Sequence, residues 1–170
     1  MKTMSLEQAL HQWDGRSAEE IGFIYDRYAG HTDFVLSISA LIKKSDSQKG
    51  ASWLLKRHLE NEQQLEPKQT AQLWALLSDL ECWETKLHLL QSLPYLKVGN
   101  NDKQSVECFL RHCLSDNNKF VRAWAYHGFY ELSLQYPEYQ EETKKFFALA
   151  MEDEAASVKA RIRNILKKGF

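Results

Sequence analysis

In this 170-residue sequence, one cysteine and one histidine have a spacing that suggests metal binding. Cys108 and His112 are four residues apart, so on one helix they would share a face and offer two ligand atoms to a metal ion. Two ligands do not complete a zinc site, and Cys113 would point to another side of the helix. Small cysteines are common in helical cores. We therefore predict no metal site and no cofactor.

Motifs for other kinds of catalysis are absent from the sequence. The glycines never lie close enough together for a phosphate-binding loop or a dinucleotide fingerprint. Paired acids such as Glu141-Glu142 lie at expected helix ends or on solvated faces, where carboxylates have a structural use. Four further histidines belong to no HExxH motif: His11, His31, His58 and His88. We expect that the protein is not an enzyme.

Composition and charge narrow the class of protein. Hydrophobic residues make up 44% and charged residues 26%, which is ordinary for a globular chain, and the net charge of −1 excludes a polycation. No apolar run approaches the roughly 20 residues that cross a bilayer, and the start of the sequence lacks a signal-peptide pattern. Three cysteines are too few for a disulfide framework. We expect a cytoplasmic protein with no membrane partner.

Helical periodicity dominates the sequence, and no stretch alternates with the period of two that strands show. Ser17 and Glu20 predict a capping box at the start of the second helix, and Gly30 is a predicted stop. Pro67 and Pro137 fit helix starts, and Pro94 must end or kink a helix. The predicted helices cover about 6–13, 17–30, 32–44, 49–62, 67–79, 82–95, 103–115, 118–135, 138–152 and 156–168. The fold class is all-α.

Four nine-residue segments repeat along the chain, starting at Ala51, Thr85, Val121 and Val158, with spacings of 34, 36 and 37 residues. In each segment the first position is small or β-branched, and positions one, five, eight and nine are largely apolar. An aspartate lies six or seven residues before the second position of each segment: Asp46, Asp79, Asp116 and Asp153. A fixed period of this length is typical of a solenoid of helix pairs.

These segments resemble HEAT repeats of the armadillo-like class. The resemblance is carried by the turn aspartate followed by Val-Arg or Val-Lys, and Asp116 with Val121-Arg122 and Ala125 is the best copy. It implies a short right-handed α-α superhelix, with residues 1–30 as N-terminal capping helices and about four repeats in 31–170. The period is shorter than the common HEAT length, which leaves a tetratricopeptide-type stack open, although the Trp-x2-Leu-Gly-x2-Tyr pattern is missing.

The repeated acids and cations have an expected structural role. The carboxylate can cap the second helix of its repeat, and the cation can pair with an acid of its own or the next repeat. We therefore interpret four residues as structural rather than catalytic: Asp116, Arg122, Asp153 and Lys159.

The resemblance implies that the second helices line a concave surface where binding takes place. Positions six, seven and ten of the segments should point outward, and this strip carries four Lys/Arg against one Glu. Tyr126, His127 and Arg163 are expected at its centre, unless the strip is an ordinary solvated face with tyrosines half-buried between repeats. The predicted partner-binding residues are Lys56, Arg57, Gln91, Tyr126, His127, Tyr130, Arg163 and Lys167.

The predicted function is a small non-catalytic HEAT-like adaptor that binds a protein or peptide, acidic in character, on its concave face. Nucleic-acid binding through the same basic strip is the alternative. Some alkylpurine DNA glycosylases also resemble HEAT stacks, and Trp124, Tyr126 and Arg163 would match part of such a site. No concave carboxylate completes it, since Glu131 lies off the strip.

Two further features bear on partners. The five tryptophans, at positions 13, 53, 74, 83 and 124, fall mostly on apolar helix faces, so we expect core packing rather than a base-stacking platform. Residues 1–85 carry a formal charge of −4 and residues 86–170 a charge of +3. This asymmetry either favours head-to-tail association or is incidental.

Overall fold

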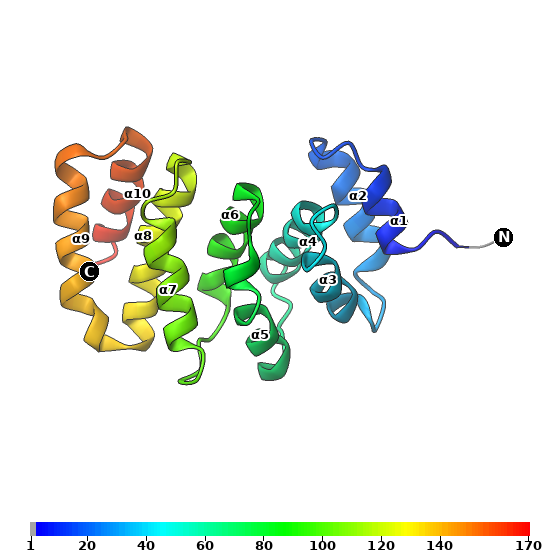
Figure 1. The fold of residues 1–170 in the computed structure, drawn as a ribbon, viewed down its shortest axis with the longest axis horizontal. Helices are drawn as coiled ribbons and strands as arrows, with labels where there is room; N and C mark the ends of the chain where they lie inside the picture. The colour runs from blue at the N-terminus through cyan, green and yellow to red at the C-terminus, as the bar shows by residue number, and fades with distance from the viewer. Residues whose placement is uncertain (1–2) are drawn as a thin grey trace.

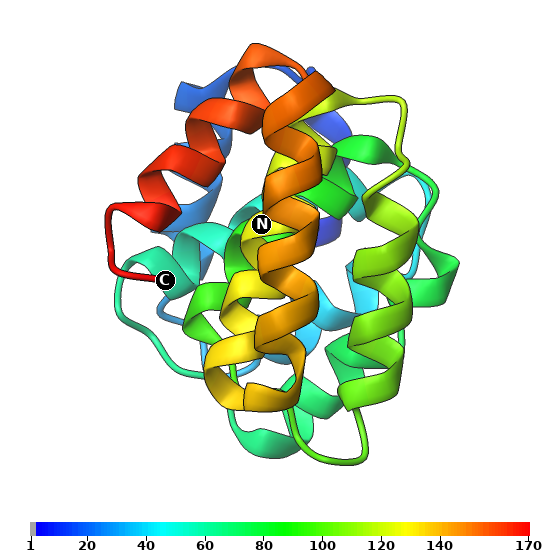
Figure 2. The same cartoon turned by 90° about the vertical axis from the view of Figure 1, so that its left-hand side faces the viewer.

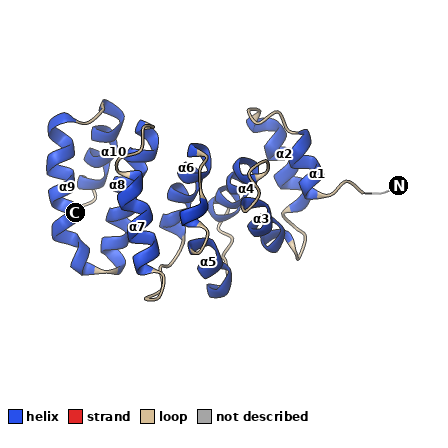
Figure 3. Cartoon of the chain, in the orientation of Figure 1, coloured by secondary structure: helices blue, strands red, loops and turns tan. Residues whose placement is uncertain are grey.

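The computed structural model describes residues 3–170, and within this range it contains helices and no strand (Figures 1 and 3). Each of the ten predicted helices has a counterpart, so the all-helical prediction is confirmed. None of the helices in the described range has the length and hydrophobicity to span a membrane. The helices are α1 (Leu6–Gln12), α2 (Ala18–Tyr28), α3 (Phe34–Ile42), α4 (Gln48–Glu60), α5 (Pro67–Trp74), α6 (Trp83–Ser92), α7 (Lys103–Cys113), α8 (Lys119–Gln135), α9 (Gln140–Asp153) and α10 (Ala156–Leu166).

Local sequence signals set several helix ends. The Ser17 hydroxyl accepts a hydrogen bond from the backbone N–H of Glu20 at 3.1 Å, which is one half of the predicted capping box. Pro67 is the first residue of α5, where its missing N–H costs nothing. α6 ends at Ser92, and Pro94 lies in a 3-10 turn that follows it.

We group consecutive helices two by two and call each group a unit: α1–α2, α3–α4, α5–α6, α7–α8 and α9–α10. The two helices of a unit pack on each other in four of these groups, whereas α5 packs mainly on α3. The first and last units lie at opposite ends of the long axis (Figure 1). Along this axis the second helices pack in order, α2 on α4, α4 on α6, α6 on α8 and α8 on α10. Figure 2 looks along the axis, with α9 and α10 in front of the earlier helices.

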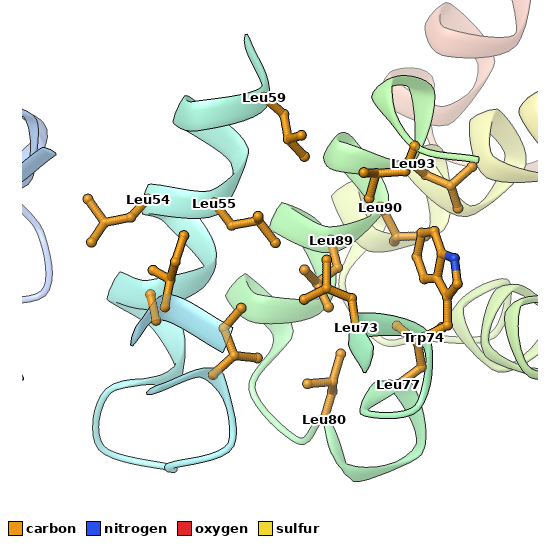
Figure 4. Packing of buried hydrophobic residues seen from close by; sticks show 14 of the residues in the cluster. Leu54, Leu55, Leu59, Leu73, Trp74, Leu77, Leu80, Leu89, Leu90 and Leu93 are labelled. Carbon is orange, nitrogen blue, oxygen red and sulfur yellow. The ribbon is translucent and has the colours of Figure 1, made fainter. Parts of the chain in front are cut away.

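The positions predicted to face inward are buried. Positions one, five and eight are buried in all four repeated segments. Position nine is buried in the first three segments, whereas Leu166 in the fourth is 42% exposed. Figure 4 shows Leu55 and Leu59 of α4 pointing toward α6. The apolar pattern therefore gives the correct rotation of each second helix about its axis.

Of the four residues predicted to be structural, Asp116 and Arg122 form ion pairs that connect neighbouring units, whereas Asp153 and Lys159 form none in the described residues. Lys86 pairs with Asp116 at 3.2 Å, and Arg122 pairs with Glu154 at 2.9 Å. Arg122 also donates to the carbonyl of Asp116. Asp153 is exposed and forms no ion pair in the described part of the chain, so Glu154 has the role that we expected of Asp153. Glu154 is favoured because it also accepts a hydrogen bond from the N–H of Ala155, just before α10.

Candidate binding surface

The charged members of the predicted strip lie at the surface. Arg57, Arg163 and Lys167 are exposed, and none of them forms an ion pair within residues 3–170. Lys56 is partly buried and lies 3.6 Å from Glu60, one turn later on α4. Because Lys56 is partly buried, the exposed positive charge of the strip comes mainly from the other three cations. Gln91 is half-buried.

His127 and Tyr130 are buried, so the prediction that they point outward is wrong. His127 is 6% exposed, and its ring stacks on Trp124 with ring centroids 4.9 Å apart. Its Nε2 lies 3.1 Å from a carboxylate oxygen of Glu131, so the carboxylate that we placed off the strip is bound to a residue of the strip. Tyr130 is 8% exposed and packs edge-on against Phe170.

Residues from α10 and the C-terminal turn cover this part of α8. The guanidinium carbon of Arg161 lies 3.9 Å from the Trp124 ring centroid, a cation–π contact. Burial lowers the pKa of Arg161 from its ordinary value. Sequence reasoning did not identify Arg161 or Phe170 as part of this surface. One signal was available, because Trp124 and Arg161 hold the same fourth position in consecutive segments.

Tyr126 is neither fully buried nor fully exposed. Its ring is half-buried and meets Phe147 of α9 edge-on, with centroids 6.3 Å apart. Burial raises the pKa of its hydroxyl above the ordinary value. The alternative interpretation, with tyrosines half-buried between repeats, fits Tyr126 better than the role of a free anchor does.

Four of the five tryptophans are buried or pack against the buried core, as predicted, and Trp83 is the exception. Trp74 is buried, with 3% of its surface exposed, whereas Trp83 is 41% exposed. The other three are partly buried: Trp13, Trp53 and Trp124. Helical periodicity marked these residues as apolar, but it could not show that a neighbouring unit leaves one side of each ring open.

Three of these indoles line one pocket of about 310 Å³. Trp13 comes from the α1–α2 connection, Trp53 from α4 and Trp83 from the start of α6, so three successive units contribute. The Trp13 Nε1–H donates to the carbonyl of Ser17 at 2.8 Å, which fixes the ring against the start of α2. The pocket also contains residues from the first turns of α2, α4 and α6, where backbone N–H groups favour negative charge.

Charged side chains surround the pocket. The Lys49 ammonium lies 6.0 Å from the Trp13 ring centroid and 3.1 Å from the Glu84 carboxylate. Burial opposes the charged form of Glu84, but hydrogen bonds from Cys82 and Lys49 hold its pKa below the ordinary value. Arg16 is exposed at the rim. The Asp14 carboxylate interacts with both Arg16 and Lys49, so the rim carries charges of both signs.

His88 forms part of the pocket wall as a neutral ring. Its Nδ1 lies 2.8 Å from the Ser52 hydroxyl, which belongs to the preceding unit. Burial lowers the pKa of His88 to about 4, and the positive charge of Lys56 acts in the same direction. His88 is therefore uncharged at neutral pH. Because Lys56 acts on His88, the predicted strip lies next to this pocket.

Of the α7 residues considered as metal ligands, Cys108 and His112 lie on the exposed side of the helix and Cys113 is buried. Cys108 and His112 are exposed and line a second pocket of about 580 Å³ between α5 and α7. Cys113 is buried, and burial raises the pKa of its thiol to about 12. Residues 3–170 contain no group of three or more potential metal ligands.

Comparisons of the chain with protein-family models, with curated proteins and with solved structures found no match.

Proposed function

We propose that the chain is a small, non-catalytic, cytoplasmic scaffold of HEAT-like helix pairs. It binds a protein or peptide partner on the surface that α2, α4, α6, α8 and α10 form. The observation that carries this proposal is the pocket between Trp13, Trp53 and Trp83, where indoles from three units remain open to solvent.

The HEAT-like arrangement is supported by packing at equivalent positions. The first, fifth and eighth positions of the four segments are buried, and each second helix packs on the next. Each unit thus covers an apolar face of its neighbour, which is the principle of a repeat stack.

A peptide is the ligand class that best fits the pocket. Tryptophan is enriched among the residues that dominate binding energy, and these rings surround a space large enough for an apolar side chain. Arg57 is exposed and forms no ion pair in the described residues, so it would steer an acidic partner toward this surface. We place the binding site at the tryptophan pocket and the neighbouring Lys56 and Arg57, because α10 and Phe170 cover His127 and Tyr130.

Single-stranded nucleic acid is the second candidate. The same three rings offer faces for base stacking, worth about 1–3 kcal/mol per base, and Arg16 could contact a phosphate. Binding of this kind weakens steeply as salt is added, because counterions are released from the phosphates.

A selection from a displayed library of random peptides against the immobilised protein tests the proposal. We expect acidic sequences with an apolar residue to be enriched and to quench tryptophan fluorescence when titrated in solution. The double variant Trp53→Ala/Trp83→Ala should lose about 2 kcal/mol or more of binding energy, roughly thirtyfold in Kd.

The matched control is Phe120→Ala, since Phe120 is 48% exposed but does not line the pocket. It should leave the peptide affinity unchanged. Equal affinity of the wild type and the double tryptophan variant would contradict the proposed location. Binding of a uridine oligonucleotide with a steep salt dependence, and no selected peptide, would favour the second candidate.

A further inference from the structure

A ladder of charged pairs joins each unit to the next. His11 lies 3.1 Å from Asp46, Lys49 3.1 Å from Glu84, Lys86 3.2 Å from Asp116 and Arg122 2.9 Å from Glu154. In these four pairs the cationic or imidazole partner belongs to one unit and the acid belongs to the following unit. The Lys44–Glu7 pair between the first two units runs the other way, so the direction belongs to these four pairs and not to every ion pair between units.

Both ends of this ladder are open. Lys159 holds the second position of its segment, as Lys86 and Arg122 do, but it forms no ion pair in the described chain; its ammonium lies 3.4 Å from the carbonyl of Glu152. At the other end, Asp14 forms the same turn as Asp116. Asp14 accepts the N–H of the residue two positions later at 2.7 Å, and Asp116 does so at 2.8 Å.

The side of α10 that faces away from α8 is also incompletely covered. Leu166 is 42% exposed, whereas the residues at the same position in the three preceding segments are at most 1% exposed. At position nine of the third segment, Phe129 is covered by Phe146 of α9, the first helix of the following unit. Leu149 of α9 is 62% exposed at the same end of the molecule.

The two end units carry opposite charge. α10 and the two lysines after it contain five Lys/Arg and no acid, and α2 contains three acids and one arginine. Arg163 is exposed on α10, and Glu19 and Glu20 are exposed in the first turn of α2. Phe23, 64% exposed on α2, adds an apolar group beside these acids.

We propose that a second copy of this chain docks its α1–α2 end on the α9–α10 end, so that copies associate head to tail. Lys159 of one copy then faces the Asp14 turn of the next and continues the ladder. Such a contact joins two different surfaces, so the free ends of each assembly can bind further copies. Exposed Leu166, Leu149 and Phe23 supply apolar area, and the charges set the orientation.

Sedimentation velocity over a wide concentration range tests the proposal. The weight-average mass of the wild type should rise with concentration at low salt and fall when salt is added. Two double variants each reverse the charge of one end. Glu19→Lys/Glu20→Lys changes the acidic end on α2, and Lys159→Glu/Arg163→Glu changes the basic end on α10. Each should weaken self-association at least about tenfold, while circular dichroism shows the wild-type helix content.

Mixing these two variants distinguishes head-to-tail docking from contacts between two like ends. The α2 variant keeps a native basic end and the α10 variant keeps a native acidic end, so their mixture restores one wild-type interface. We expect the equimolar mixture to associate with wild-type affinity, although each variant alone associates at least about tenfold more weakly. A monomeric mixture, a wild type that stays monomeric throughout, or reversals without effect would overturn the proposal.

Discussion

At the scale of single residues, burial decides which ion pairs contribute to stability. The side chains of Lys86 and Asp116 are each only 12% exposed, so water screens their attraction weakly. Lys144 and Glu141 are also close, at 3.7 Å, but their side chains are 50% and 84% exposed. An exposed pair of this kind contributes little, because solvent and lost side-chain entropy offset the attraction.

Asp116→Asn should therefore lower the free energy of unfolding by about 2 kcal/mol or more, because it leaves the Lys86 ammonium largely buried without a countercharge. Asparagine retains an oxygen for the N–H of Asn118, so the turn itself is preserved. Glu141→Gln is the control and should change stability by less than about 0.5 kcal/mol. Urea titration measures both, and similar small losses in the two variants would contradict this assignment.

His88 makes stability depend on pH. Its pKa is lowered to about 4 in the folded chain, so between pH 6.5 and 4 the unfolded chain binds a proton that the folded chain does not. Stability should be highest above pH 6.5 and should fall as the pH drops through this window. The loss attributable to His88 is up to about 3 kcal/mol.

His88→Gln should flatten this part of the stability profile, because glutamine does not titrate. Urea unfolding of the wild type and the variant at several pH values between 4 and 7 gives the comparison. The carboxylates with lowered pKa contribute equally to both proteins, so the difference between the two slopes isolates His88. Parallel slopes would show that His88 titrates normally.

At the scale of elements, close approach between α7 and α8 explains a glycine in the middle of a helix. A β-carbon added at Gly128 would collide with the Leu110 side chain, which is itself fully buried. Gly22, in α2, has no neighbouring atom within 4 Å of such a carbon. The two helical glycines thus offer a matched comparison of packing against intrinsic helix propensity.

Gly128→Ala should destabilise the protein by about 1–3 kcal/mol, the usual range for overpacking a core. Gly22→Ala should stabilise it by about 0.5–1 kcal/mol, because alanine has less backbone entropy to lose and has room for its methyl group. Thermal unfolding monitored by circular dichroism should show shifts of opposite sign. Stabilisation by both substitutions would mean that Leu110 moves aside without cost.

The sequence was sufficient to predict the helices and the rotation of the second helices, because apolar residues recur at fixed positions in every segment. It was insufficient to predict which residues on the sides of these helices are buried. Burial there depends on side chains of neighbouring helices, and these do not recur at fixed positions. Tyr130 is buried by Phe170, and His127 by Trp124 and the surrounding helices, although both hold positions that are exposed in the α10 segment. For the same reason, periodicity did not reveal the pocket beside Trp53 and Trp83.

At the scale of the whole molecule, the buried apolar residues form two clusters. The larger extends from Leu6 to Tyr139 and involves all of the first eight helices. The smaller lies between α8, α9 and α10 and is centred on Phe147, Val158 and Ile162. Because the smaller cluster involves only the last three helices, we expect the last unit to open while the rest of the chain stays folded.

Ile162→Ala should therefore act locally. Ile162 is fully buried in the smaller cluster, and its truncation should cost about 2–4 kcal/mol through lost contacts and a cavity. Native-state hydrogen exchange should show this loss in α9 and α10, while amides in α4 and α6 keep wild-type protection. Leu90→Ala, which removes buried carbons from the larger cluster, is the control and should lower protection in the central helices. Uniform loss of protection in the Ile162 variant would mean that the two clusters unfold together. In that case the Lys86–Asp116 and Arg122–Glu154 pairs would couple the last units too strongly for separate opening.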